Sequence, residues 1–368
     1  MKKLAAGFLF LLTVLGFCAV SFADCGAAVL IDGATGRVFF EQGKDIILPM
    51  ASTTKIMTAL LALEEEDLDQ YFTVNSRAIR VEGSSMGLEA GDRVTLRVLA
   101  AGMLLASGND AANAAAVRIA GSVEAFSVRI NLRAAEIGMT NTHFVTPSGL
   151  DDEEHYSTAY DMALLAREAL KNPDFAAICS QSSMRVRYGN PPYDRWLANH
   201  NRLLKMVEGA TGVKTGFTKK SGRCLVSAAE RNGVSLICVT LHCSDDWNYH
   251  KEIYEEYFGL LRAEELSGFV GGIRVPVAGS VVPSVRCAVR PVTAALMEGE
   301  LQRIEAAVFL EPFLFAPVEA GETVGRAVFS LDGREVAAAE IYAAEDAATV
   351  VGKPGFPEWV RSRIISMF

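Results

Sequence analysis

The chain is poor in the residues that metal and redox centres require. Its 368 residues include only five histidines, and their spacing fits no zinc site. Seven cysteines are present, but none forms a Cys-x-x-Cys motif. We therefore expect no metal and no cofactor, and we expect most of the cysteines to be small buried apolar residues.

An excess of positive charge is also missing. The 35 lysines and arginines are outnumbered by 44 aspartates and glutamates, which gives a formal net charge of −9. Because nucleic acids are polyanions bound through basic surfaces, this composition argues against a nucleic-acid partner.

Long apolar runs are scarce, and the clearest one lies at the start. Lys2 and Lys3 precede an apolar run over residues 4–20, and Ser21-Phe22-Ala23 follows it. This pattern predicts a secretory signal peptide over residues 1–23 and hence an exported protein. Its removal changes the formal charge from −9 to −11, because two lysines are lost. A membrane anchor is the alternative, although the run is short for a full span.

Three short polar motifs carry the chemistry: Ser52-Thr53-Thr54-Lys55, Ser107-Gly108-Asn109 and Lys214-Thr215-Gly216. A serine hydroxyl needs a neighbouring base, and residues three apart share one face of a helix, so Lys55 can reach Ser52. A buried lysine next to a second cation, here Lys214, can lose its proton. Alone, the first motif could equally be a capped helix with a surface lysine.

The other two motifs lie where a site could form. Residues 107–109 separate two predicted helices, at 95–106 and 110–120, and alone could be an ordinary helix-end turn. Residues 214–216 precede two β-like runs, at 223–230 and 234–241, joined by the hairpin signal Asn232-Gly233. Gly216 would let a substrate backbone approach a sheet edge closely, while the alternative is a solvated lysine before a turn.

The ordered set of motifs resembles that of penicillin-binding proteins and serine β-lactamases. The chain is most similar to low-molecular-weight serine D-alanyl-D-alanine carboxypeptidases, because the resemblance extends to residues 138–144, 147–150, 156–163, 199–204 and 316–325. Gly108 stands where class A β-lactamases have aspartate, which favours the carboxypeptidases.

The resemblance implies a role for each motif residue. Ser52 would be the acylated nucleophile, Lys55 its general base, and Ser107 a proton relay towards the leaving amine. The remaining positions would bind substrate: the Asn109 amide, the Lys214 and Thr215 side chains, Gly216, and the backbone N–H of Phe217, which with that of Ser52 would form the oxyanion hole.

One expected residue is missing. Many relatives have an arginine shortly after the second hairpin strand that helps to bind the terminal carboxylate of the substrate. Residues 245–251 contain no arginine here. His250 or Lys251 could substitute for it, and His250 could equally be a plain surface residue.

Length and pattern predict two domains. Residues 24–261 combine early apolar runs at 27–31 and 37–40 with the helices and the late hairpin, which indicates an α+β domain with an antiparallel sheet and helices around it. This matches the transpeptidase-like fold that the resemblance implies. Residues 262–351, rich in short valine and alanine runs between glycines and prolines, predict a small all-β domain.

The tail at 352–368 predicts an amphipathic helix. Phe356, Trp359 and Ile364 fall on one side and Arg361 on another, which suits a helix lying in the membrane interface. Packing against the β-domain is the alternative.

Together these features predict an exported serine carboxypeptidase that removes the terminal D-alanine from peptidoglycan stem pentapeptides and is acylated by β-lactams. A serine β-lactamase and a catalytically weak penicillin-binding sensor are the alternatives.

Overall fold

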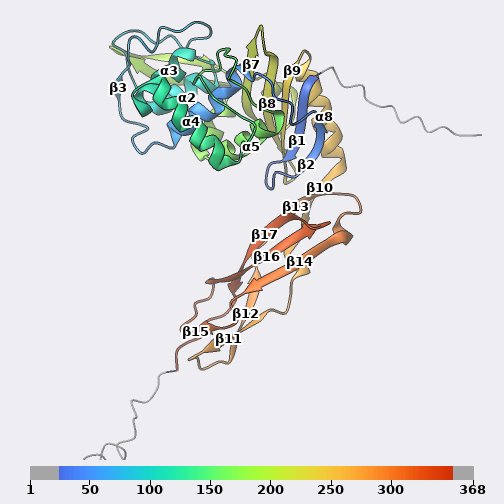
Figure 1. Cartoon of the computed structure of the whole chain (residues 1–368). Coiled ribbons are helices and arrows are strands. Elements are labelled where there is room, and N and C mark those ends of the chain that lie inside the picture. The colour runs from blue at the N-terminus through green and yellow to red at the C-terminus, as the bar shows by residue number, and fades with distance from the viewer. Residues whose placement is uncertain (1–24, 351–368) are drawn as a thin grey trace, which may run out of the picture.

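The structure is a computed structural model, and it describes residues 25–350. The predicted signal peptide at 1–23 and the predicted membrane-associating helix at 352–368 lie outside the described residues. Figure 1 shows a larger lobe of helices around a sheet, followed by a smaller lobe made of strands.

A five-stranded antiparallel sheet forms the centre of the larger lobe. Its strands are β1 (Cys25–Asp32), β2 (Val38–Gln42), β7 (Ala210–Thr218), β8 (Gly222–Arg231) and β9 (Val234–Cys243). Their order is β2-β1-β9-β8-β7, so β7 is an edge strand. The predicted hairpin is confirmed: Arg231 pairs with Val234, and both Asn232 and Gly233 have the positive φ that a tight hairpin turn needs.

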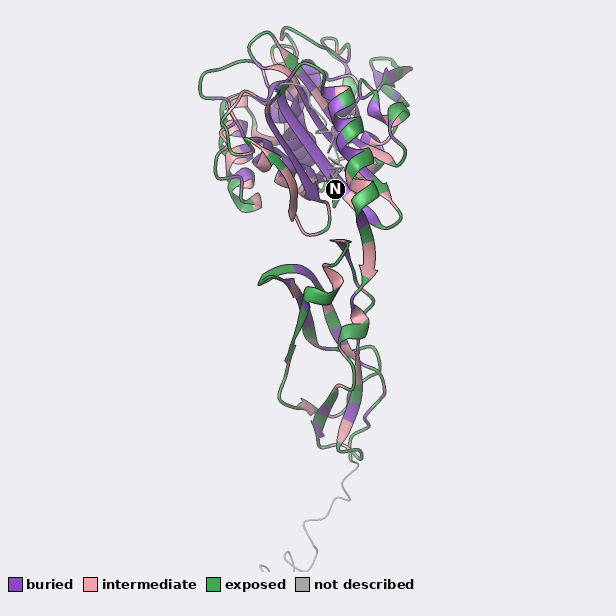
Figure 2. Cartoon of the chain, turned by 90° about the vertical axis from the view of Figure 1, so that its right-hand side faces the viewer, coloured by how far each residue is buried: buried purple, intermediate pink, exposed green. Residues whose placement is uncertain are grey.

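Helices cover both faces of this sheet. One face is covered by α1 (Lys55–Leu63), α2 (Leu96–Leu104), α3 (Asn109–Ala120), α4 (Val123–Ile137), α5 (Ala159–Leu170) and α6 (Pro173–Cys179), and the other by α8 (Asp246–Leu260). Alternate residues of β1 serve the two cores: Val29 and Ile31 pack with α1–α6, and Ala28 and Leu30 pack with α8. Figure 2 shows the resulting buried sheet.

Shorter elements complete the larger lobe. They are the 3₁₀ turn η1 (Ala51–Thr54), the helix α7 (Leu203–Met206), and the two-stranded pairs β3 (Phe72–Thr73) with β4 (Arg93–Val94) and β5 (Ser183–Gly189) with β6 (Pro192–Ala198).

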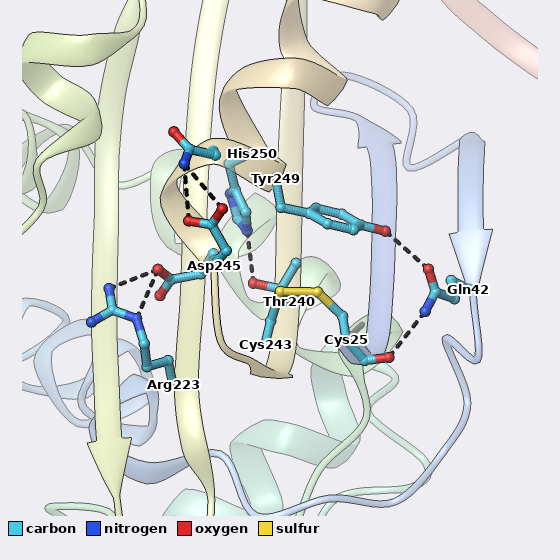
Figure 3. Close-up of a disulfide and its surroundings, with 10 residues drawn as sticks. Cys25, Gln42, Arg223, Thr240, Cys243, Asp245, Tyr249 and His250 are labelled. Carbon is cyan, nitrogen blue, oxygen red and sulfur yellow. Dashed lines mark hydrogen bonds and ion pairs between the residues drawn. A yellow bond between two sulfur atoms is a disulfide. The ribbon is translucent and has the colours of Figure 1, made fainter. Parts of the chain in front are cut away.

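A disulfide between Cys25 and Cys243 joins the start of β1 to the end of β9 (Figure 3), across 218 residues of sequence. Cys224 and Cys238 are both free and buried. Because β1 and β9 are neighbours with these two cysteines in register, the bond ties the sheet at its centre.

The smaller lobe is built from strands. They are β10 (Leu261–Glu265), β11 (Arg274–Ala278), β12 (Ser284–Val289), β13 (Thr293–Met297), β14 (Ile304–Leu310), β15 (Leu314–Phe315), β16 (Thr323–Leu331) and β17 (Arg334–Ala343), with 3₁₀ turns η2 (Ser267–Phe269) and η3 (Leu301–Arg303). Six strands form one sheet in the order β14-β16-β17-β12-β11-β15, and β10 pairs with β13.

The two lobes contact each other through the β10–β13 ribbon. Leu261 and Ala295 of this ribbon belong to the core beneath α8. Arg37 of the larger lobe donates two hydrogen bonds to the carboxylate of Glu300, at 2.6 and 2.9 Å. The predicted fold class, an α+β transpeptidase-like domain with a small all-β domain after it, is confirmed. Within residues 25–350, no helix has the length and apolar character needed to cross a membrane.

Candidate active site

Ser52 and Lys55 meet at the junction of η1 and α1. Ser52 lies in the 3₁₀ turn and Lys55 begins the α-helix, with 2.8 Å between Ser52 Oγ and Lys55 Nζ. The sequence suggested a helix-capping serine, but no side chain caps this turn. Ala51 has a φ of 49°, a strained value for a residue with a side chain. The backbone turn thus directs the serine hydroxyl towards the amine.

Burial favours the neutral form of the Lys55 amine. Its side chain is fully buried, and its pKa is well below the usual lysine value, mainly because burial desolvates the ammonium and also because Lys214 repels it. Lys214 is itself buried, which lowers its pKa to about 7. Two buried cations in this space repel each other, which favours the neutral form of the Lys55 amine.

The loop at residues 145–150 holds the amine in place. Lys55 Nζ donates a hydrogen bond of 2.6 Å to the carbonyl of Ser148. One helical turn later, the Thr58 hydroxyl donates to the carbonyl of Pro147 at 2.7 Å. The Pro147-Ser148 part of the family-like segment is therefore packed directly against α1.

A buried histidine, which the sequence did not single out, connects this loop to η1. His155 Nδ1 accepts a hydrogen bond from the backbone N–H of Val145 at 2.9 Å, so Nε2 carries the proton and donates to the Thr54 hydroxyl at 2.8 Å. Thr54 in turn donates to the carbonyl of Ala51 at 2.8 Å. Burial lowers the pKa of His155 to about 4, which keeps it neutral and structural at pH 7.

The second motif forms the turn between α2 and α3. Ser107 has a φ of 58° and lines the cleft beside Ser52. Asn109 is buried: its side-chain nitrogen donates to the carbonyl of Glu82 at 2.6 Å, and its backbone N–H donates to the carbonyl of Ser84 at 2.7 Å. Asn109 is thus engaged in anchoring the loop at 82–88, which brings Ser84 to the cleft.

Asp110 was missed by the sequence reading. Its buried carboxylate accepts hydrogen bonds from the Ser85 hydroxyl at 2.6 Å and from the backbone N–H groups of Met86 at 2.9 Å and Leu88 at 3.0 Å. An acidic residue in the first turn of a helix was the available signal, since it suits the positive end of the helix dipole.

The third motif lies on the edge strand β7. Lys214 donates to the carbonyl of Thr215 at 2.7 Å, while Thr215, Gly216 and Phe217 line the cleft. A Cβ at position 216 would lie 3.2 Å from the backbone nitrogen of Ser52 and 3.1 Å from the carbonyl oxygen of Met50. Only glycine therefore lets β7 close against the N–H of Ser52 without crowding.

These elements enclose a cleft of about 540 Å³. Of the predicted site residues, the structure brings Ser52, Ser107 and the stretch 215–217 to its wall, with Lys55 and Lys214 buried behind. Further wall residues that the sequence did not assign a role are Asn199, His200, Arg202, Arg223, Asp246 and Trp247.

His250 is a correction. It does not reach the cleft, because its ring is fully buried between the Ser227 hydroxyl, at 2.7 Å, and the Thr240 hydroxyl, at 2.9 Å. Figure 3 shows the contact with Thr240. Burial lowers its pKa to about 3, so the ring is neutral and cannot attract a carboxylate. The helical periodicity of α8 directs residues 249, 250, 253 and 254 to the sheet, and this determines the orientation of the ring.

We expect Gly149→Ala (G149A) to disable the base. Gly149 has a φ of +82°, and a Cβ there would lie 1.9 Å from the carbonyl oxygen of Ala51. The chain must then shift at η1 and at Ser148, which positions Lys55, so acylation should slow by at least about 100-fold, since a shift of about 1 Å at a site can cost that much. Acylation kinetics with a fluorescent penicillin would measure this.

Gly138→Ala (G138A) is the matched control. Gly138 also has a positive φ, +89°, but a Cβ there meets nothing within 4 Å. It should therefore lose about 1 kcal/mol of stability from backbone strain and keep its acylation rate. Equal acylation rates in the two variants would contradict the assigned role of the loop at 145–150.

The fold and the site define a class: a serine hydrolase in which a buried lysine lies next to the serine hydroxyl. Comparison with known proteins identifies the family. Residues 20–245 match the Peptidase_S11 family, D-alanyl-D-alanine carboxypeptidase, and residues 287–349 match the penicillin-binding protein 5 C-terminal domain. The chain belongs to the S11 D-alanyl-D-alanine carboxypeptidases.

Individual relatives are similar to this chain along most of its length. It is 31% identical to the D-alanyl-D-alanine carboxypeptidase DacF of Bacillus subtilis, over 88% of this chain and 86% of that one. It is 32% identical to DacC of Escherichia coli, over 91% and 89%. Among solved structures, penicillin-binding protein 5 of Haemophilus influenzae has a TM-score of 0.68 at 26% identity and covers 89% of this chain and 98% of its own.

Proposed function

We propose that this enzyme is an exported carboxypeptidase that removes the terminal D-alanine from peptidoglycan stem pentapeptides through an acyl-Ser52 intermediate. The observation that carries the proposal is the 2.8 Å separation between Ser52 Oγ and a fully buried Lys55 Nζ of lowered pKa at the wall of the cleft. A neutral amine at this distance can take the hydroxyl proton as the oxygen attacks.

Acylation follows from the positions of these groups. Ser52 Oγ bonds to the carbonyl carbon of the penultimate D-alanine while its proton passes to Lys55. The backbone N–H groups of Ser52 and Phe217 stabilise the oxyanion that forms, and the close approach of Gly216 to Ser52 supports their pairing. The C–N bond then breaks, and the leaving D-alanine amine takes a proton relayed from Lys55 through Ser107.

Deacylation uses the same base in reverse order. Lys55 takes a proton from a water molecule as its oxygen attacks the acyl carbon, and the proton is returned to Ser52 Oγ as the ester bond breaks. In the proposed enzyme, β-lactams acylate Ser52 in the same way and block it. Lys214, buried behind the cleft, supplies positive charge towards an anionic ligand in its protonated form, and Thr215 supplies a hydroxyl.

The proposed location is the outer face of the cell membrane. The signal-peptide pattern at 1–23 supports export, and the Cys25–Cys243 disulfide is typical of oxidising compartments. The amphipathic pattern at 352–368 supports attachment to the membrane surface.

The deciding experiment is the release of D-alanine from a stem pentapeptide by the chain without residues 1–23. We expect one equivalent of D-alanine per peptide. Acylation of Ser52 by penicillin without any release of D-alanine would instead indicate a penicillin-binding sensor. Rapid turnover of the chromogenic cephalosporin nitrocefin, in place of a stoichiometric burst, would indicate a β-lactamase. Either result overturns the proposal.

A further inference from the structure

The cleft contains an arginine on a different element from the one the sequence suggested. The α8 segment at 245–251 provides no cation for a carboxylate, because His250 is buried and neutral and Lys251 is absent from the cleft wall. The wall instead holds two arginines, Arg202 before α7 and Arg223 on β8.

Arg223 lies beside the substrate-facing strand. In the antiparallel pairing of β7 with β8 it is the direct partner of Phe217, the residue that follows the Lys-Thr-Gly motif. Directly paired residues project from the same face of a sheet, and so do residues two apart on one strand. Arg223 therefore shares a face with Phe217 and with the Thr215 hydroxyl, and all three line the cleft.

The guanidinium is held in a fixed orientation. Its Nε and Nη2 donate to the same oxygen of Asp246, at 2.9 and 2.6 Å, and Asp246 is almost fully buried at the start of α8. Its Cζ lies 5.2 Å from the ring centre of Trp247. Figure 3 shows Arg223 reaching across towards the start of α8. One edge of the group is thus anchored by protein.

The other edge is available to a ligand. The Arg223 side chain is 38% exposed, and Nη1 has no hydrogen-bond partner within residues 25–350. A guanidinium binds carboxylates through paired N–H groups, and a group already held in place loses little entropy on binding. Arg202, by contrast, is exposed, and within the described residues no ion pair or hydrogen bond orients its side chain.

We propose that Arg223 is the specificity-determining residue that receives the C-terminal carboxylate of the substrate, with Asp246 and Trp247 as its positioning residues. This inference rests on the proposed function. The carboxylate would lie between the free edge of the guanidinium and the Thr215 hydroxyl, which is two residues before Phe217 on β7. The cation that many relatives have shortly after the second hairpin strand is here supplied by the first strand of the hairpin, β8.

The test compares two peptides that differ only at the C-terminus. One is an acyl-D-alanyl-D-alanine tripeptide with a free carboxylate, and the other is the same peptide as its amide. In Arg223→Gln (R223Q) we expect kcat/KM on the acid to fall about 10–100-fold, the usual effect of losing a charge-assisted hydrogen-bond pair, while the amide changes less than about threefold. The preference for the acid then collapses.

Further variants separate binding from general disruption. Arg223→Lys (R223K) keeps the positive charge but loses the paired N–H groups of the guanidinium, so it should recover part of the preference for the acid. Asp246→Asn (D246N) should weaken the preference for the acid by a smaller factor than R223Q. Lys251→Gln (K251Q), a change of cation outside the cleft wall, should leave both rates unchanged.

Three outcomes overturn the assignment: an unchanged acid preference in R223Q, an equal loss on acid and amide, or a collapse in Arg202→Gln (R202Q) instead. Failure of the proposed function is distinguishable, because the wild-type enzyme would then release neither D-alanine from the acid nor D-alaninamide from the amide.

Discussion

Ser52→Ala (S52A) forms no covalent adduct with benzylpenicillin, whereas the wild-type chain gains the mass of one penicillin molecule. This is the expected result because the hydroxyl of Ser52 is the only one at 2.8 Å from Lys55 Nζ among the described residues. Loss of the nucleophile leaves only binding and oxyanion contacts, so D-alanine release should fall by about 10⁴-fold or more. Intact-mass analysis and a D-alanine assay measure the two effects.

Ser122→Ala (S122A) is the control for removing a hydroxyl. Ser122 caps α4 by accepting from the N–H of Ala125, away from the cleft, so its loss should cost about 1 kcal/mol of stability and no activity. A penicillin adduct that persists in S52A would contradict the assignment and would direct attention to Ser84 or Ser107, the other serines of the cleft wall.

Much of the site could be predicted because its chemistry is local in sequence. The helical spacing of Ser52 and Lys55, the turn at 107–109 and the strand at 214–217 each have their own pattern. The signal at Asn232-Gly233 correctly predicted a tight hairpin between β8 and β9, in which Arg231 pairs with Val234. The order of these motifs along the chain then indicated the fold class.

The groups that were missed act across long separations. Thr54 and His155 are 101 residues apart, and the Cys25–Cys243 bond spans 218. Single patterns cannot show such pairs, since the contacts exist only after the sheet and α1 have packed. The error at His250 has a different cause: the residue was proposed because it lies in the segment where many relatives have an arginine, while the periodicity of α8 decides which side chains face the sheet.

Arg223 illustrates the same limit. In the sequence it is simply the first residue of a β-like run. The carboxylate-binding arginine of many relatives was expected at residues 245–251 instead. Antiparallel pairing places it opposite Phe217 and brings Asp246 and Trp247 to its side. The hairpin predicted from residues 223–230 and 234–241 did not include β7, so this neighbour of the motif had no assigned role.

Lys55→Met (K55M) is expected to slow acylation about 10²–10⁴-fold, the usual contribution of a general base. The same change should raise the melting temperature at pH 7. In the wild-type chain the pKa of Lys55 is lower in the folded state than in the unfolded state, so unfolding takes up a proton between those two pKa values and stability rises with pH across that window. K55M lacks this penalty, and its advantage should shrink as the pH approaches the ordinary lysine pKa.

The pH profile separates this base from a merely structural lysine. Acylation needs the neutral amine, so the wild-type rate should increase with pH along a limb set by Lys55, well below the ordinary lysine range. Lys214→Gln (K214Q) removes the repelling cation, and the limb should therefore move to higher pH. The move should be partial, because desolvation is the larger cause of the lowered pKa and remains in the variant. A limb that stays in place in K214Q would show that the proton acceptor for Ser52 is not coupled to Lys214, and the role given to Lys55 would fail with it.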